Sequence, residues 1–252
     1  MSIEASHAEG LGRITLTDPP LNILTRSMLA QLKKGLAELA AEPSLRVVLL
    51  TATGKHFSAG ADVGEHLPPT YEELIPEFLD TVLSIATFPL PVVAAVQGRC
   101  LGGGFEVAMS ADLIVAAEGA SFGQPEILLG VLPPAACAML PFLCGRGTAA
   151  EIVYTGEAMS SADALRAGIV QQVVPDDQLE EAALVLAGRI TRHSGAALRA
   201  GKRMLAGGDE SALREALSRA GRIYTEQLME TRDAVEGLQS FMEKRRPTWS
   251  HE

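Results

Sequence analysis

Two glutamates occupy positions where a chain seldom leaves a charge. Glu106 lies one helical turn inside an apolar stretch that continues over residues 107–109, and Glu126 borders a charge-free run over residues 127–145. An unpaired carboxylate in such surroundings is unfavourable, because burial penalises its charged form. If the two side chains meet, one can hold a proton while the other accepts one, which suits general acid–base work on a water molecule. A separate structural salt bridge for each glutamate is the alternative interpretation.

Two segments of small residues could present backbone N–H groups to a ligand. The first is KHFSAGAD over residues 55–62, and the second is GRCLGGGFE over residues 98–106, where three glycines begin a predicted helix. Small residues allow close approach to the backbone, and a helix N-terminus directs its N–H groups and positive dipole end at one spot. The second segment is neither a P-loop nor a dinucleotide fingerprint, since no Gly-Lys-Ser/Thr follows and Val107 replaces the third glycine. An ordinary loop and tight helix–sheet packing are the alternatives.

The surrounding pattern predicts the elements that must position these groups. Short apolar or β-branched runs predict strands at 13–17, 46–51, 92–96, 113–116 and 169–174, and helical spacing predicts helices at 71–87, 102–110 and after a cap at Thr25. Strands that alternate with helices indicate an α/β fold with a largely parallel sheet. From Asp177 onward the pattern is almost wholly helical. We therefore expect an α/β core over residues 1–192 and a helical C-terminal lobe over residues 193–252.

Composition narrows the classes of partner. The 252-residue chain has 21 Lys and Arg against 31 Asp and Glu, a net charge of −10, which argues against nucleic acid and anionic membranes because both need cationic surface. The three cysteines form no CxxC pair and the five histidines are scattered, so neither a disulfide framework nor a metal site is predicted. The first residues show no signal peptide, and prolines in the charge-free run argue against a membrane helix. The expectation is a cytoplasmic protein.

Three motifs, taken in order, resemble the enoyl-CoA hydratase/isomerase (crotonase) superfamily. They are FSAGAD over 57–62, LGGGFE over 101–106 and FGQPEI over 122–127, and the likeness extends from residues 20–22 to 243–245. The resemblance implies a crotonase-like ββα spiral core with a C-terminal helical lobe that trimerises, giving a homotrimer or a dimer of trimers. It also implies an acyl-CoA substrate, and no cofactor beyond the CoA moiety of that substrate.

The resemblance also implies roles for particular residues. Ala61 and Gly103 match the two backbone N–H donors of an oxyanion hole, and removing one such donor typically costs on the order of 10²–10³ in rate. Glu106 and Glu126 match the acid/base pair that holds the water. The residues that match CoA-binding or substrate-binding positions are Ala59, Gly60, Asp62, Gly102, Pro134, Phe241 and Lys244.

One segment departs from the straight-chain hydratases of that superfamily. Those usually continue with a PGAGG-type stretch after the second glutamate, whereas this chain has GVLPPAAC over residues 130–137. Proline and alanine add Cβ bulk and stiffen the backbone beside the thioester. The change is similar to the branch that adds water in a 1,4 sense to cyclohexa-1,5-diene-1-carbonyl-CoA, as are CLGGG over 100–104, EHLP over 65–68 and DAVEGL over 233–238. We therefore expect a hydro-lyase acting on an α,β-unsaturated, alicyclic acyl-CoA.

Other functions stay open at this point. A general short-chain enoyl-CoA hydratase would use the same residues, whereas an isomerase or hydrolase on this scaffold would not need both glutamates. A non-catalytic CoA-ester-binding or RNA-binding homologue is a more distant alternative, and the net charge of −10 argues against RNA. His56 and His66 are expected to be solvated or hydrogen-bonded loop residues.

Overall fold

A six-stranded sheet forms the centre of the computed structural model, which describes residues 2–205 and 210–252. The strands lie in the order β1 (Ile3–Ala8), β2 (Leu11–Leu16), β3 (Val47–Ala52), β4 (Val92–Val96), β6 (Leu113–Ala117) and β9 (Gln172–Val174). β1 pairs antiparallel with β2, and the other pairs in this sheet are parallel, as the alternation of strands and helices predicts. β1 was not predicted from the sequence, and β9 is three residues shorter than predicted.

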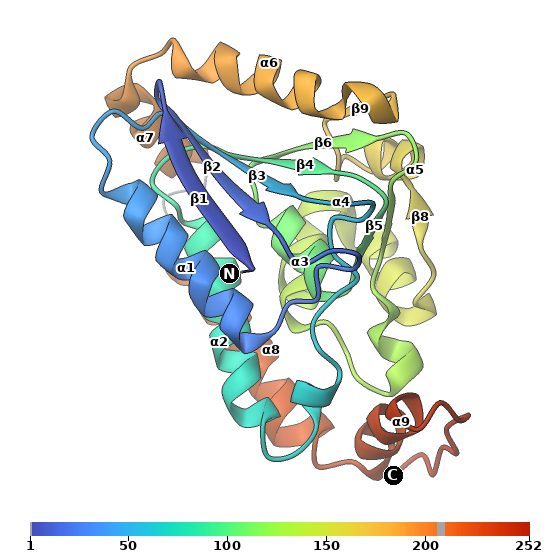
Figure 1. The fold of residues 1–252 in the computed structure, drawn as a ribbon. Coiled ribbons are helices and arrows are strands. Elements are labelled where there is room, and N and C mark those ends of the chain that lie inside the picture. The colour runs from blue at the N-terminus through green and yellow to red at the C-terminus, as the bar shows by residue number, and fades with distance from the viewer. Residues whose placement is uncertain (1, 206–209) are drawn as a thin grey trace.

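Helices cover both faces of this sheet (Figure 1). α1 (Arg26–Ala40) and α2 (Tyr71–Ala86) lie on one face, and α6 (Leu179–Thr191) lies on the other. The predicted cap is confirmed, because the Thr25 side chain accepts a hydrogen bond from Met28 N at 3.2 Å. The resulting α/β architecture agrees with the expected fold class.

A second, three-stranded sheet brings the two glutamate-bearing segments together. It consists of β5 (Arg99–Leu101), β7 (Ser121–Gly123) and β8 (Met159–Ser160) in that order. β5 leads into α3 (Gly103–Met109), and β7 leads into the short 3₁₀ helix η2 (Pro125–Leu129). β5 and β7 are parallel, with Leu101 opposite Gly123, so the two segments leave the sheet side by side. Strands of two or three residues show no periodicity, which is why this sheet was not predicted.

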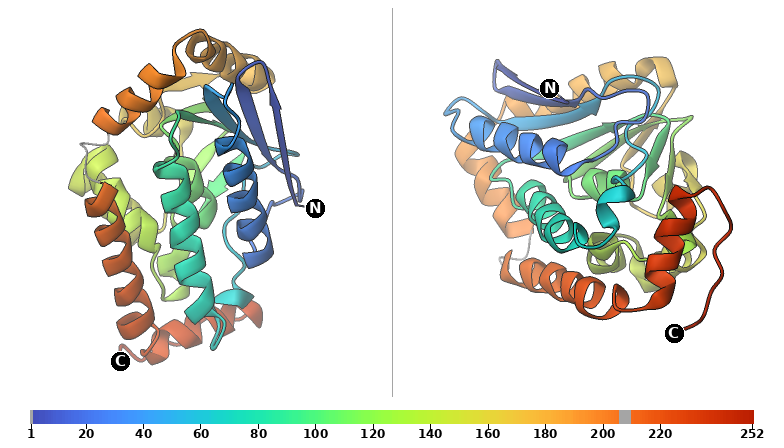
Figure 2. Two further views of the ribbon diagram at one scale, coloured as in Figure 1. Left: turned by 90° about the vertical axis from the view of Figure 1, so that its left-hand side faces the viewer. Right: turned by 60° about the horizontal axis from the view of Figure 1, so that its bottom comes forward.

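The C-terminal region is helical, as predicted. It contains α7 (Gly195–Leu205), α8 (Glu210–Ile223), a π-helical segment η4 (Tyr224–Leu228) and α9 (Arg232–Met242). α8 packs on α2 and on α4 (Pro134–Thr155), whereas α9 packs on η2 and on the 3₁₀ helix η1 (Gly64–His66) (Figure 2). The division of the chain at residues 192 and 193 stays a prediction, and residues 206–209 of the proposed lobe lie outside the described residues.

α4 is the one helix in the described ranges that is long and apolar enough, by length and composition, to cross a membrane. Its backbone is non-helical at Gly145, with φ 77° and ψ 158°, so the helix breaks there. The helical part from 134 to 144 spans roughly 16 Å at 1.5 Å per residue. This is about half of the ~30 Å hydrocarbon core of a bilayer. α4 therefore provides no continuous membrane span.

Candidate active site

A small cavity of about 80 Å³ lies where α2, α3, η2, the start of α4 and α9 meet. It brings together eight of the residues selected from the sequence, namely Ala59, Gly60, Ala61, Gly102, Gly103, Glu106, Glu126 and Pro134. The remaining lining is mainly apolar: Val63, His66, Leu74, Ile75, Phe78, Pro125, Leu129, Val131, Leu132, Pro133 and Leu238. An apolar cleft with a few convergent polar groups is the usual form of a small-molecule site.

Buried polar side chains fix the loop that carries Ala61. Ser58 Oγ donates to Asn22 O at 2.8 Å and accepts from Gly60 N at 3.2 Å. Asn22 is itself fully buried, and its Nδ2 donates to His56 O at 2.8 Å. Because these bonds hold the loop on both sides, Ala61 reaches the cavity on a rigid support.

The backbones of Ala61 and Gly103 approach each other closely. A Cβ added at Gly103 would lie 3.2 Å from Ala61 N, and one added at Gly60, where φ is 116°, would lie 3.8 Å from Gly103 N. Within the described part of the chain, neither the Ala61 nor the Gly103 N–H donates to a backbone carbonyl. Two free N–H groups that converge on one cavity form an arrangement able to stabilise an oxyanion.

Glu106 is buried in α3 and held by the start of α4. Glu106 is only 3% exposed, and its Oε1 accepts a hydrogen bond from Ala136 N at 2.8 Å. Burial raises the pKa of Glu106 from 4.5 to about 7, although N–H groups of Ala136 and Ala135 act in the opposite direction. Glu106 can therefore exchange a proton near neutral pH.

Glu126 lies over the backbone of Gly102. A Cβ at Gly102, where φ is 52°, would come within 2.5 Å of Glu126 Oε1, so only glycine fits here. In the amide orientation that satisfies its neighbours, Gln124 donates to Glu126 Oε2 at 3.1 Å and to Gly102 O at 3.3 Å. Burial, and then the charge of Glu106, hold the pKa of Glu126 well above its ordinary value.

The ionisation of one of these two carboxyl groups therefore affects that of the other. The charge of Glu106 opposes ionisation of Glu126, so near neutral pH the two carboxyl groups are only partly ionised. Among the residues that the structure describes, neither Glu106 nor Glu126 forms an ion pair, which makes the salt-bridge interpretation wrong. The rings of Phe105 and Phe122 pack edge to face with their centroids 5.4 Å apart, so the two segments that carry the glutamates are in direct contact.

Three of the selected residues do not line this cavity. Asp62 Oδ1 accepts a hydrogen bond from Glu65 N at 3.1 Å, so its side chain organises the turn before η1. Phe241 and Lys244 are exposed at the end of α9, and their contact with CoA stays a prediction. His66 is hydrogen-bonded in its loop, as expected, through Nδ1 and Asp62 O at 2.8 Å, but it also lines the cavity.

Gln124, which is fully buried and orients the second glutamate, was not predicted as a site residue. The sequence did contain a signal for this residue. Gln124 stands two residues before Glu126, and residues 122–129 have no other polar side chains besides these two. Leu238 of α9, which closes one side of the cavity, was not predicted either.

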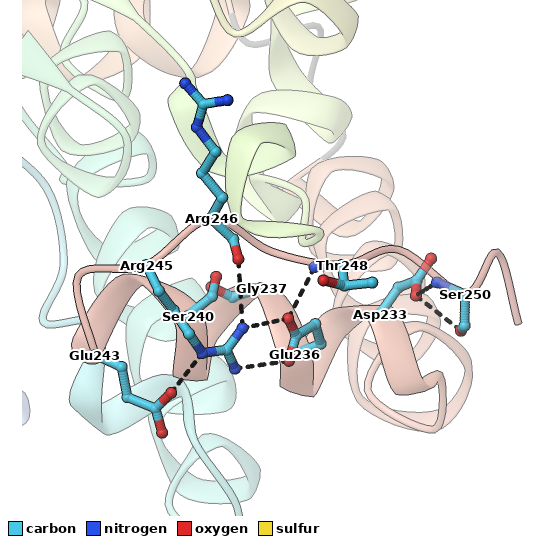
Figure 3. Close-up of polar contacts among 9 residues, drawn as sticks. All are labelled: Asp233, Glu236, Gly237, Ser240, Glu243, Arg245, Arg246, Thr248 and Ser250. Carbon is cyan, nitrogen blue, oxygen red and sulfur yellow. Dashed lines mark hydrogen bonds and ion pairs between the residues drawn. The ribbon is translucent and has the colours of Figure 1, made fainter.

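α9 is held in place by the residues that follow it (Figure 3). Glu236 accepts two hydrogen bonds from Arg245, at 2.5 and 2.8 Å, and one from Thr248 N at 2.8 Å. These donors lower the pKa of Glu236 to about 2. Asp233 caps the return of the chain by accepting from Ser250 N at 2.6 Å. The segment after α9 therefore folds back along the helix that carries Leu238.

Two free N–H groups and two buried carboxyl groups that meet in one apolar cavity are groups able to polarise a carbonyl and to move a proton. Residues 6–252 match the sequence profile of the enoyl-CoA hydratase/isomerase family, and the chain belongs to this family. The resemblance noted from its motifs is therefore confirmed.

Individual relatives agree with this assignment. The chain is 37% identical to cyclohexa-1,5-dienecarbonyl-CoA hydratase of Thauera aromatica, over 95% of this chain and 92% of that protein. It is 36% identical to 2,3-dehydroadipyl-CoA hydratase of Escherichia coli, over 93% and 92%. The crystal structure of an enoyl-CoA hydratase/isomerase from Pseudoalteromonas atlantica superposes with a TM-score of 0.90 at 29% identity, covering 99% of this chain and 100% of that one. The crotonase-like fold class is thus confirmed.

Proposed function

We propose that this enzyme is a hydro-lyase that adds water to the conjugated double bond of an α,β-unsaturated acyl-CoA thioester. The observation that carries the proposal is the coupled pair Glu106 and Glu126, which lines the same cavity as the free N–H groups of Ala61 and Gly103. An isomerase or a hydrolase on this scaffold does not require both carboxyl groups.

The residues divide the reaction between them as follows. Ala61 and Gly103 donate to the thioester oxygen and stabilise the negative charge that develops there when the oxygen of water bonds to carbon. Glu106 in its ionised form accepts a proton from that water. Glu126 in its protonated form delivers a proton to the carbon that carries the enolate charge. The product gains one water, and the two glutamates end with their protons exchanged.

For the acyl group, we infer a compact alicyclic dienoyl thioester such as cyclohexa-1,5-diene-1-carbonyl-CoA. The similarity to the hydratase of Thauera aromatica supports this choice. Pro133 and Pro134 also support it, because they line the cavity where a stiff, bulky wall restricts the shape of the acyl group. A general short-chain enoyl-CoA hydratase is the alternative, and the relation to the dehydroadipyl-CoA hydratase favours it to a similar degree.

We further infer a homotrimer or a dimer of trimers. Phe142 is 86% exposed and Leu143 41% exposed on α4, and a neighbouring subunit would remove such apolar side chains from water. Mass measurement in solution tests this proposal, and a monomeric mass would contradict it. The cytoplasmic location, and the expectation that no cofactor beyond CoA, nucleic acid or membrane takes part, stay predictions.

The direct test compares two substrates. Purified enzyme is assayed spectroscopically with crotonyl-CoA and with cyclohexa-1,5-diene-1-carbonyl-CoA in parallel, and E106Q and E126Q serve as matched variants. We expect faster turnover of the cyclic diene and a loss of about 10²–10⁴ in kcat in each variant, the range of general acid–base catalysis. Faster hydration of crotonyl-CoA would replace the alicyclic substrate by a short linear one. Full activity of both variants would refute the acid/base assignment.

A further inference from the structure

Tyr224 carries a buried hydroxyl that has no hydrogen-bond partner. The residue is 2% exposed, and across residues 2–205 and 210–252 its Oη is the one buried side-chain oxygen or nitrogen that lacks a partner. A buried hydroxyl without a partner is unfavourable, and the large majority of such groups in native proteins are paired. An exception of this kind calls for a reason, and a bound ligand or an ordered water is among the common ones.

The position of Tyr224 connects it with the active site. Its ring lies near that of His66, with the centroids 6.3 Å apart, and His66 lines the active-site cavity. Tyr224 also lines an outer hollow that shares Leu132 and Pro134 with this cavity. The tyrosine therefore stands beside the cavity wall, at the start of the π-helix η4. π-Helical segments are rare and occur frequently at functional sites.

The charges of the active-site carboxylates affect the ionisation of the Tyr224 phenol. Burial, followed by the charges of Glu126 and Glu106, holds the pKa of Tyr224 well above its ordinary value. The phenol therefore keeps its proton and stays a hydrogen-bond donor throughout the neutral pH range.

Donors are scarce at this end of the cavity. Pro133 and Pro134 have no backbone N–H. His66 Nδ1 is used by Asp62 O at 2.8 Å, which leaves Nε2 as an acceptor, and burial lowers the pKa of this histidine. An ionised carboxylate only accepts hydrogen bonds. The Tyr224 hydroxyl supplies the donor that these groups do not offer.

We propose that Tyr224 Oη donates a hydrogen bond to the oxygen atom that enters as water and remains as the hydroxyl of the product. The inference rests on the hydration reaction proposed above. A water held between Glu106 and Glu126 can direct both hydrogens to carboxyl oxygens. One lone pair of this water then attacks the substrate, and the other accepts the hydrogen bond from Tyr224. In the reverse direction the same bond stabilises the departing oxygen.

The Y224F variant tests this role because it removes only the hydroxyl. Losing an unpaired buried hydroxyl should leave the melting temperature unchanged or raise it, whereas kcat should fall roughly 10–100-fold. Y154F is the matched control, since Tyr154 is 73% exposed on α4, and it should keep wild-type kcat. A Y224F enzyme with full kcat, or one whose kcat loss accompanies a clearly lower melting temperature, would overturn the proposal.

A binding experiment separates this inference from the proposed function. Calorimetry compares 3-hydroxybutyryl-CoA with butyryl-CoA, which differ only in the hydroxyl that hydration introduces. We expect wild-type enzyme to prefer the hydroxylated ester and Y224F to lose about 10-fold of that preference. An equal preference in both proteins would refute the role of Tyr224 and would leave the proposed function untouched. Failure of wild-type enzyme to hydrate either enoyl-CoA of the substrate comparison would instead refute the proposed function.

Discussion

Replacing Glu106 by glutamine should stabilise the fold above pH 7 while removing activity. Glu106 is 3% exposed, and burial raises its pKa from 4.5 to about 7. Between these values the folded chain holds a proton that the unfolded chain has released, so the free energy of unfolding decreases as the pH rises through this interval. At about 1.36 kcal/mol per pH unit, the interval corresponds to roughly 3 kcal/mol. Glutamine carries no charge, so E106Q avoids this decrease and can still accept the hydrogen bond from Ala136 N.

Urea unfolding of wild type and E106Q at about pH 4 and about pH 8 measures this effect. At the lower pH the two proteins should have similar free energies of unfolding, and at the higher pH E106Q should be more stable by roughly 3 kcal/mol. E151Q is the control, because Glu151 is an exposed glutamate on α4 and its replacement should leave the pH dependence unchanged. A difference between E106Q and wild type that is the same at both pH values would refute the reasoning from burial.

Three further outcomes are expected from the same site. The rate kcat should rise through about pH 7 as Glu106 ionises and fall at higher pH as Glu126 loses its proton, whereas a pH–rate profile without these limbs would contradict the assignment. Gly102→Ala places a Cβ within 2.5 Å of Glu126 Oε1 at a φ of 52°, so kcat should fall roughly 100-fold while affinity for butyryl-CoA is kept, and unchanged kcat would show that Glu126 tolerates displacement. Replacing Pro133 and Pro134 together by glycine should raise kcat/KM for crotonyl-CoA relative to the cyclic diene, and an unaltered ratio would remove these prolines from the account of specificity.

The parts of the fold that follow from local pattern were predictable. β4 agrees with its predicted range residue for residue, and Thr25 caps α1 as expected, because apolar runs and capping residues act over a few neighbouring positions. β1 was missed, since its central residues alternate weakly and only Ile3 is buried at the sheet edge. The small sheet of β5, β7 and β8 was missed because its strands are too short for any period to show.

The site was predictable only where single residues conflict with their surroundings. Glu106 and Glu126 could be selected because a carboxylate beside apolar sequence is unusual, although their meeting depends on the pairing of Leu101 with Gly123 across the small sheet. Tyr224 gave no such signal, since a tyrosine among helical residues is ordinary, and Gln124 could be noticed only by its place two residues before Glu126. Their positions near the glutamates arise from contacts between segments far apart in the chain, which no local pattern contains.

The place of Leu238 in the cavity wall has a consequence for the order in which the enzyme is made. The loop around Ala59 leaves the ribosome long before α9 does, and at 5–20 residues per second the delay is roughly 10–40 s. During this time Leu129, in the η2 segment on which α9 packs, remains uncovered on that side. A nascent chain therefore contains both glutamates and both N–H donors before Leu238 is available to close the cavity. Activity should therefore appear late in synthesis. A chain whose synthesis ends before α9 would form the central sheet but would lack one wall of the active-site cavity.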